Sequence, residues 1–416
     1  MSFSPTSISL SPNTQPDDVK LALKLIFQPW LWKNGKAIKE LEDEFKKYLG
    51  DGYTFSFNAG RSADLAILNA LNFKKGDEVL LQAFTCNAAV NPIIHLGLKP
   101  IFVDIDDSLN LNPNDLKKKI TFKTKAIFIQ HTFGWPAQIN EIKKISQQYN
   151  LYLIEDCAHA LGAKYHGVLC GTFGDASFFS FGRDKVISSV YGGMAFTKDE
   201  KISENLKYFQ KKVDFPSNFW ILQQLLHPIL MNYLILPSYN FLKIGQLILA
   251  ALINLKILSK SVESVENKGK LPNYFPKKIP NSLALLAKNQ FKKLEEFNSH
   301  RKFIAKIYQE NLKNKNFVLP FSKEDNLREP IFLKYPILTK NSQKIISKLK
   351  KEGIILEDGW RNSVVVPPKT DLKEVYYQPG SCPEAEKAAK KIINLPTHIN
   401  ITKETAEKIV SLILKC

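Results

Sequence analysis

Cysteine is scarce in this sequence, and its few residues form no recognisable pattern. The 416-residue chain holds five of them: Cys86, Cys157, Cys170, Cys382 and Cys416. An odd number argues against a disulfide framework, and the spacing does not match a metal site. We therefore expect free thiols, no bound metal and a reducing cytoplasm.

Arginine is also rare, although the chain is strongly basic. The net charge is +18, yet arginine occurs at only five positions: Arg61, Arg183, Arg301, Arg328 and Arg361. Proteins that recognise bases depend on arginine forks, and no helix-turn-helix or aromatic–basic module is present. We expect no nucleic-acid partner. The lysines instead favour phosphorylated substrates or an acidic membrane surface.

A targeting segment is missing from the start of the sequence. Residues 1–20 are polar and contain prolines, without a basic n-region or an apolar h-region, so we expect no signal peptide. The rest has the composition of a globular protein and is long enough for two domains.

Strands and helices are predicted to alternate over residues 53–197, after a helical segment at 19–49. Strands are expected at 55–58, 78–82, 100–105, 126–130, 151–155, 177–181 and 193–197, and helices at 63–71, 87–96, 112–118 and 139–149. The strands are apolar without period-two alternation, which is typical of a parallel sheet buried on both faces. This predicts an α/β fold with a large domain over residues 1–213. A long helix at 283–312 and further short elements predict a smaller α/β domain over 272–416.

The segment between these domains, residues 214–271, is unusually apolar. Residues 215–242 hold no acidic residue, lysine or arginine, and 241–258 hold only two lysines. Its only other marked features are two prolines and a narrow polar stripe: Pro228, Pro237, Gln223, Gln224 and His227. A helix apolar on most sides must be buried in something, but these stretches are shorter than the roughly 20 residues of a membrane span. Two alternatives stay open: a helical hairpin lying in one membrane leaflet, or extra core or dimer interface.

One lysine and one aspartate follow predicted strands and point to a cofactor. Asp156 follows the strand at 151–155, and Lys185 lies shortly after the strand at 177–181. In pyridoxal phosphate enzymes a lysine bonds to the cofactor, and an aspartate keeps the pyridine nitrogen protonated so that the ring accepts electrons. A lone lysine is usually a solvated surface residue. The prediction of a pyridoxal phosphate site therefore rests on the lysine and aspartate together with their neighbours.

Other candidate residues lie at the ends of predicted strands. Gly60 joins a strand to a helix, where a close backbone approach and free N–H groups suit a phosphate. Cys86, Asp156, Ser180 and Lys185 also fall at or just beyond strand ends. Ligands of doubly wound sheets bind at the carboxyl ends of strands, so we expect these residues to converge on one pocket.

These segments resemble the DegT/DnrJ/EryC1/StrS family of sugar aminotransferases, which are fold type I pyridoxal phosphate enzymes. The matching pieces are Gly76-Asp77-Glu78-Val79, Phe84-Thr85, residues 100–106, Glu155-Asp156, Ala158-His159-Ala160, Phe179-Ser180-Phe181, Lys185, Gly192-Gly193, residues 382–386 and residues 394–398. The likeness covers nearly the whole chain except residues 214–271.

The resemblance implies roles for individual residues and a homodimer. Lys185 and Asp156 would be catalytic, with Lys185 moving the proton between substrate and cofactor carbons. The cofactor-binding set would be Gly60, Arg61, Ser62, Cys86, Asp156, Ala158, His159, Ser180 and Lys185. Within it, Ser180 and the backbone of residues 60–62 would hold the phosphate, Ala158 would lie against the ring, and His159 would reach the ring hydroxyl.

Several positions depart from the family pattern. Cys86 stands where an aromatic usually stacks on the ring, Gly182 where a histidine is common, and Arg61 where threonine is common. No counterpart is evident for the asparagine that a partner subunit contributes, expected near Pro276. Lys185 is kept, whereas relatives that dehydrate sugars have histidine there.

The resemblance implies transfer of an amino group from glutamate or glutamine to a keto-sugar, with a nucleotide-linked sugar favoured, for amino-sugar or surface polysaccharide synthesis. Two alternatives remain: a non-catalytic, membrane-docked scaffold or sensor, and another pyridoxal phosphate reaction such as elimination or decarboxylation. The expected location is the cytoplasm, with residues 215–258 as a candidate for peripheral contact with the inner membrane face. Such contact would make a lipid-linked sugar a further candidate substrate.

Overall fold

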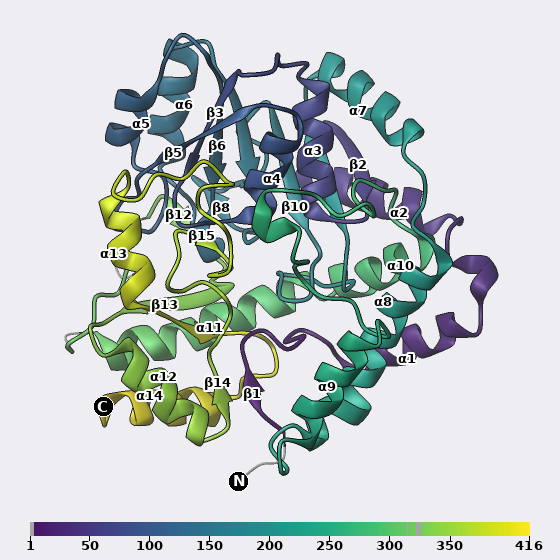
Figure 1. Ribbon diagram of the computed structural model, residues 1–416, viewed down its shortest axis with the longest axis vertical. Helices are drawn as coiled ribbons and strands as arrows, with labels where there is room; N and C mark the ends of the chain where they lie inside the picture. Colours follow the sequence, from purple (N-terminus) through teal and green to yellow (C-terminus); the bar gives the residue numbers. More distant parts are fainter. Residues whose placement is uncertain (1–3, 314, 322–325) are drawn as a thin grey trace.

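A seven-stranded sheet forms the centre of the fold (Figure 1). The computed structural model describes residues 4–313, 315–321 and 326–416. All neighbouring strands are parallel except β11, which runs antiparallel to β2 and β10, so the predicted mostly parallel sheet is confirmed. In sheet order the strands are β2 (Tyr53–Phe57), β11 (Gly193–Thr197), β10 (Ala176–Ser180), β7 (Tyr152–Asp156), β6 (Thr124–Gln130), β3 (Glu78–Gln82) and β5 (Lys99–Val103).

Apolar side chains cover both faces of this sheet, which explains why its strands are continuous apolar runs. In β3, Val79 and Leu81 belong to one core and Leu80 to the other. The first core contains α3 (Gly60–Ala70), α4 (Asn87–His95) and α7 (Glu200–Lys212). The second contains α2 (Ala37–Leu49), α5 (Pro113–Lys119), α6 (Ile139–Gln148) and α10 (Asn281–Phe291). The sheet is therefore doubly wound.

The C-terminal part is a smaller α/β region around one antiparallel strand pair. Its elements are α11 (Leu294–Leu312), β13 (Lys334–Leu338), α12 (Ser342–Lys351), α13 (Pro383–Lys391), β16 (Ile392–Pro396) and α14 (Lys403–Leu414). Short pairings join it to the rest of the chain: β14 (Ile354–Ile355) with β1 (Thr6–Ser7), β15 (Val365–Val366) with β4 (Thr85–Cys86), and β12 (Arg328–Glu329) with β8 (Lys164–Tyr165), which also pairs with β9 (Val168–Leu169).

Two segments predicted as single helices are each divided. Residues 19–49 fall into α1 (Pro16–Ile26), a 3-10 turn at Pro29–Leu31 and α2, because Pro29 lacks the N–H that a continuing helix needs. Residues 283–312 fall into α10 and α11. No helix-breaking residue stands between these two helices. Helix α10 packs against α2, whereas α11 packs against α14. The chain therefore changes direction between them because each helix packs against a different neighbour.

The apolar segment is helical and folds onto the body of the protein. It contains α8 (Asn218–Leu230), a π turn at Met231–Ile235, a 3-10 turn at Leu236–Ser238 and α9 (Ile244–Asn254). Among the described residues, one helical stretch, Asn218–Ser238, is long and apolar enough to cross a membrane by length and composition, but half of it is buried inside the protein. Because α8 also packs against α1, that stretch resembles a core helix.

The polar stripe of α8 holds this segment in place. Gln223 donates to the carbonyl of Lys256, Gln224 accepts from Ser259 Oγ at 2.9 Å, and His227 Nε2 lies 2.7 Å from Ser11 Oγ. All three stripe residues are buried. The stripe therefore faces the protein rather than solvent.

Candidate active site

The predicted site residues converge on one cavity of about 560 Å³ at the carboxyl ends of β2, β7 and β10. Its wall includes Gly60, Arg61, Cys86, Asp156, Ala158, His159, Ser180 and Lys185. Ser62 is the one predicted residue whose side chain does not line the cavity, since its hydroxyl donates to Asn58 Oδ1 at 2.8 Å. Its backbone N–H donates to the Ala59 carbonyl at 3.1 Å, which leaves the N–H groups of Gly60 and Arg61 at this helix start.

Glycines bring the start of α3 close to the end of β10. A Cβ at Gly60 would lie 2.8 Å from Ser180 Cβ, and one at Gly193 would lie 2.5 Å from the carbonyl carbon of Ala59. No side chain caps the helix at Ala59, so its first N–H groups remain available. Free N–H groups at a helix start form an anion site, and the cradle they make here fits a phosphate.

Asp156 lies buried at the end of β7, and its Oδ1 accepts the N–H of Ala158 at 3.0 Å. Burial raises the pKa of this carboxyl, against the opposing effects of the Ala158 N–H and the Lys185 ammonium. A cationic partner in the cavity would favour its ionised form. A protonated pyridine nitrogen is such a partner.

A second carboxyl, Asp64, lies buried on α3 near Asp156. Neither of its oxygens has a hydrogen-bond partner among the described residues. Burial and the charge of Asp156 raise its pKa well above the ordinary value. The pKa of Asp64 is therefore raised further than that of Asp156. The sequence offered no sign of this, because one aspartate in an apolar helix is not distinctive.

Lys185 projects into the cavity between a histidine and an aspartate. Its Nζ lies 3.0 Å from His159 Nε2 and 3.7 Å from Asp184 Oδ1. Burial and the cations Lys185 and Lys334 hold the pKa of His159 well below its usual range. A neutral His159 therefore accepts a hydrogen bond from the Lys185 ammonium.

An ion cluster beside Lys185 joins the loop after β10 to the C-terminal α/β region. Lys334 Nζ on β13 lies 3.0 Å from Asp358 Oδ2 and 3.5 Å from Asp184 Oδ2. Burial opposes its charged form, but the two carboxylates outweigh burial and hold the pKa of Lys334 above its ordinary value. Asn394 also donates to Asp358, at 2.8 Å.

Replacing Lys334 with methionine is expected to destabilise the protein by about 3–5 kcal/mol, because the buried Asp358 carboxylate then loses its cation and the partly buried Asp184 loses one of two. Urea unfolding followed by tryptophan fluorescence measures the change. Lys350→Met is the matched control: its pair with Glu357 is exposed, and its loss costs at most about 1 kcal/mol. Equal losses for the two variants would contradict the buried cluster.

The loop of Lys185 is anchored by a buried arginine and the N-terminal segment. Asn13 donates to the carbonyls of Lys185 and Val186. Arg301 on α11 donates to Asn13 Oδ1 at 3.0 Å and to the Val186 carbonyl at 2.7 Å. Burial lowers the pKa of Arg301 to about 9, so it remains charged at neutral pH. Sequence reasoning missed both anchors, since neither stands near the strand-end motifs.

An aromatic residue that the sequence did not indicate completes the cavity. Trp360 lines it and makes edge contacts with His159 (centroids 5.1 Å apart) and Phe133 (5.0 Å). Phe133 stacks on the His159 ring at 5.6 Å. The C-terminal α/β region therefore supplies an aromatic wall to the cavity that Cys86 also lines.

The two arginines of the cavity are held by residues of the apolar segment. Arg61 forms an ion pair with Glu266, and its guanidinium lies 4.8 Å above the Phe275 ring. Arg183 donates to Ser259 Oγ at 2.7 Å. The Arg61 side chain is thus occupied, so only its backbone is free for a phosphate.

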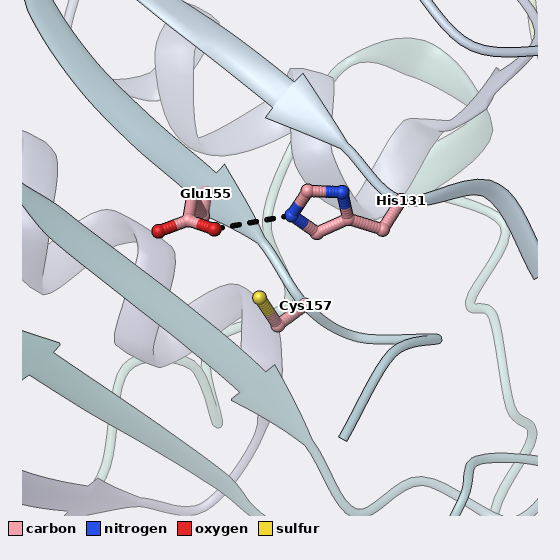
Figure 2. Close-up of side chains that lie close together, drawn as sticks. All are labelled: His131, Glu155 and Cys157. Atoms are coloured by element: carbon pink, nitrogen blue, oxygen red, sulfur yellow. Dashed lines mark hydrogen bonds and ion pairs between the residues drawn. The ribbon is translucent and has the colours of Figure 1, made fainter. Parts of the chain in front are cut away.

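His131, Glu155 and Cys157 form a buried cluster (Figure 2). Glu155 accepts hydrogen bonds from His131 Nε2 at 3.1 Å and from the N–H groups of Gly171, Phe173 and Gly174. Burial opposes ionisation, but these donors hold the pKa of Glu155 below its ordinary value. His131 Nδ1 accepts the N–H of Ala137. The ring nitrogens of His131 and the carboxylate oxygens of Glu155 are therefore occupied by hydrogen bonds within the fold.

Comparisons with known proteins agree with this geometry. The DegT/DnrJ/EryC1/StrS aminotransferase family matches residues 13–214 and 263–414. An uncharacterised protein of Methanocaldococcus jannaschii is 30% identical over 96% of this chain and 94% of its own length. GDP-perosamine synthase of Escherichia coli O157:H7 is 38% identical over 44% of this chain and 50% of its own length. The chain thus matches about half of that enzyme.

Solved structures show the same fold at lower identity. Helicobacter pylori PseC, an aminotransferase involved in pseudoaminic acid biosynthesis, superposes with a TM-score of 0.73 over all of this chain and 98% of its own, at 21% identity. The fold is fold type I of the pyridoxal phosphate enzymes. The chain belongs to the DegT/DnrJ/EryC1/StrS aminotransferase family. It is accordingly an aminotransferase that uses pyridoxal phosphate.

Proposed function

We propose that this enzyme transfers an amino group from glutamate or glutamine to a keto-sugar, which in the family is carried on a nucleotide, for amino-sugar or surface polysaccharide synthesis. The observation that supports it is the position of Lys185 in the same cavity as Asp156 and the glycine-lined start of α3. Lysine rather than histidine at this position favours transamination over sugar dehydration.

We assign the cofactor contacts to residues of this cavity. Asp156 would face the pyridine nitrogen, where its buried carboxylate gains the cationic partner it lacks. The remaining contacts are Ala158 and Cys86 beside the ring, His159 at the ring hydroxyl, and Ser180 with the backbone of Gly60 and Arg61 at the phosphate. These phosphate-binding groups lie together because the start of α3 is close to the end of β10.

Bound pyridoxal phosphate supplies an electron sink next to the substrate carbon. Lys185, whose Nζ projects into the cavity, would take a proton from that carbon as the neutral amine and return it as the ammonium. Neutral His159, 3.0 Å away, accepts a Lys185 N–H and keeps the amine directed toward the cofactor. Asp184, held by Lys334, is ionised and balances the charge of the lysine.

The test separates the two half-reactions. Glutamate or glutamine, added alone to the cofactor-loaded protein, is expected to convert the visible spectrum of the aldehyde form to that of the amine form. A panel of nucleotide-linked keto-sugars is then expected to restore the first spectrum. No change with either donor would refute the transamination, whereas donor conversion without restoration by any sugar of the panel would refute the nucleotide as the carrier.

We also propose three parts: a cofactor-binding domain over 1–213, an apolar insertion over 214–271, and a small domain with its linking helix over 272–416. The family match is interrupted between residues 214 and 263, which supports these bounds.

We further propose a homodimer in the cytoplasm, as the family resemblance implies. Size-exclusion chromatography with light scattering measures the oligomer.

We propose that residues 215–258 touch the inner membrane face peripherally. The α9 helix has no charged side chain between Lys243 and Lys256. Leu242, Leu247 and Leu255 are 79%, 67% and 69% exposed. Leucines that enter the headgroup region and lysines that attract anionic lipids act together in such contacts.

The protein is expected to co-sediment with phosphatidylglycerol–phosphatidylcholine vesicles at low salt, and more weakly at high salt. Replacing Leu242, Leu247 and Leu255 together with aspartate should abolish sedimentation, while Phe122→Asp, exposed elsewhere on the molecule, should not. Leu226, Ile229 and Leu230 are unsuitable positions because they are partly buried. If the parent ignores vesicles and the triple variant instead dissociates a dimer, the surface belongs to a second copy of the chain.

A further inference from the structure

The insertion supplies an apolar wall to the catalytic cavity itself. Leu10 of the N-terminal segment, Met231 after α8, and Leu249 and Ile253 of α9 line the same cavity as Lys185. These four residues belong to a small apolar cluster separate from the two cores of the body. None of them has a hydrogen-bonding side chain. A wholly polar substrate would gain nothing from this wall.

The segment that supplies this wall also carries exposed apolar side chains. Leu249 and Ile253 are partly buried at the cavity, whereas Leu247 and Leu255 on the same helix are largely exposed. Residues 244–255 contain no charged side chain. An apolar chain that leaves the cavity along α9 therefore meets no charge before the helix ends. Such a path is what a long hydrocarbon needs and a nucleotide does not.

A free cation lies beside this wall. Lys260 is exposed and lines the cavity, and its ammonium has no ion-pair partner in the part of the chain that the structure describes. The Arg61 guanidinium is, by contrast, paired with Glu266, whereas Arg183 donates to the neutral Ser259 hydroxyl and its Nε has no hydrogen-bond partner among the described residues. Lys260 and Arg183 are therefore the available positive groups for a phosphate in this cavity.

We infer that the acceptor keto-sugar is carried on a lipid. The sugar lies at Lys185, its phosphate or diphosphate at Lys260, and the hydrocarbon along Met231, Leu249 and Ile253. This inference rests on the proposed sugar transamination and replaces the nucleotide carrier with a lipid one.

The test compares decyl diphosphate, below its micelle concentration, with inorganic diphosphate on the cofactor-loaded protein by calorimetry. Decyl diphosphate is expected to bind on the order of tenfold or more tightly, since burying a few methylene groups is enough for that factor. Leu249→Asn should bring its affinity toward that of inorganic diphosphate. Leu247→Asn, on the outer face of the same helix, should change it by less than about twofold. Lys260→Ala should weaken both ligands.

A second variant covers the case in which Leu249→Asn fails to fold: Ile253→Phe fills the same wall without adding a polar group, and should also reduce decyl diphosphate affinity. Equal affinities for the two diphosphates would overturn the inference, as would tighter binding of uridine diphosphate than of decyl diphosphate. The spectral change that glutamate causes in the parent protein is measured in a separate experiment. If it is absent while decyl diphosphate binds, the proposed transamination fails and the lipid site stands.

Discussion

Lys185→Ala is expected to lower transamination by about 10³-fold or more, because the variant loses both the covalent attachment of the cofactor and the base that moves the proton. The cofactor should still bind non-covalently, since the start of α3, Ser180 and Asp156 remain in place. Activity with glutamate and a keto-sugar measures the loss. Equilibrium dialysis measures the retained affinity.

Chemical reduction identifies the lysine independently of turnover. Borohydride is expected to fix the cofactor of the parent protein to Lys185, and peptide mapping locates the label. Lys334 is the informative comparison, because it is the other buried lysine beside Asp184. Labelling of Lys334, or no label on the reconstituted parent, would refute the assignment.

Asp156→Asn is expected to reduce the rate by roughly 10²-fold, in line with the removal of one preorganised electrostatic partner. The amide keeps the shape of the side chain but not the charge that holds the pyridine nitrogen protonated. Steady-state kinetics measure the effect, and the visible spectrum reports whether the cofactor still binds. Near-normal rates would show that another group holds the nitrogen.

Asp64→Asn is the matched control for this variant. Asp64 is buried close to Asp156, but its pKa is raised further than that of Asp156, so we expect it to be protonated and its replacement with an amide to change no charge. We expect a small effect on rate. A loss as large as that of Asp156→Asn would mean that Asp64 is ionised and that the two acids act as a pair.

The sheet and the cofactor end of the cavity could be predicted because both depend on local sequence. Buried parallel strands are continuous apolar runs, and site residues such as Asp156 and Ser180 follow their ends directly. The positions of β3 and β11 agree with the prediction at both ends. Helix breaks were less predictable. Pro29 marks one of them, but the break before Leu294 depends on packing partners far away in the sequence.

The other half of the site could not be predicted, because it comes from segments that reach the cavity only through tertiary packing. Lys334 and Trp360 belong to the small domain, and Asn13 to the N-terminal segment; nothing around them in the sequence indicates a contact with Lys185. The polar stripe on α8 was visible in the sequence. The element that this stripe contacts could not be predicted, because periodicity defines a polar face of a helix but not what packs against that face.

The anchoring of Lys185 through Asn13 also bears on the order in which the protein is completed during synthesis. The N-terminal segment is made first, yet its partners come late: Arg301 holds Asn13, His398 Nε2 lies 3.1 Å from the Ser7 carbonyl, and Asn400 donates to the Pro12 carbonyl at 2.8 Å. Domains fold from the N-terminus as the chain emerges from the ribosome. The central sheet can therefore form while the reactive lysine is still unanchored. A nascent chain gains these anchoring contacts only after residues 301–400 have been made.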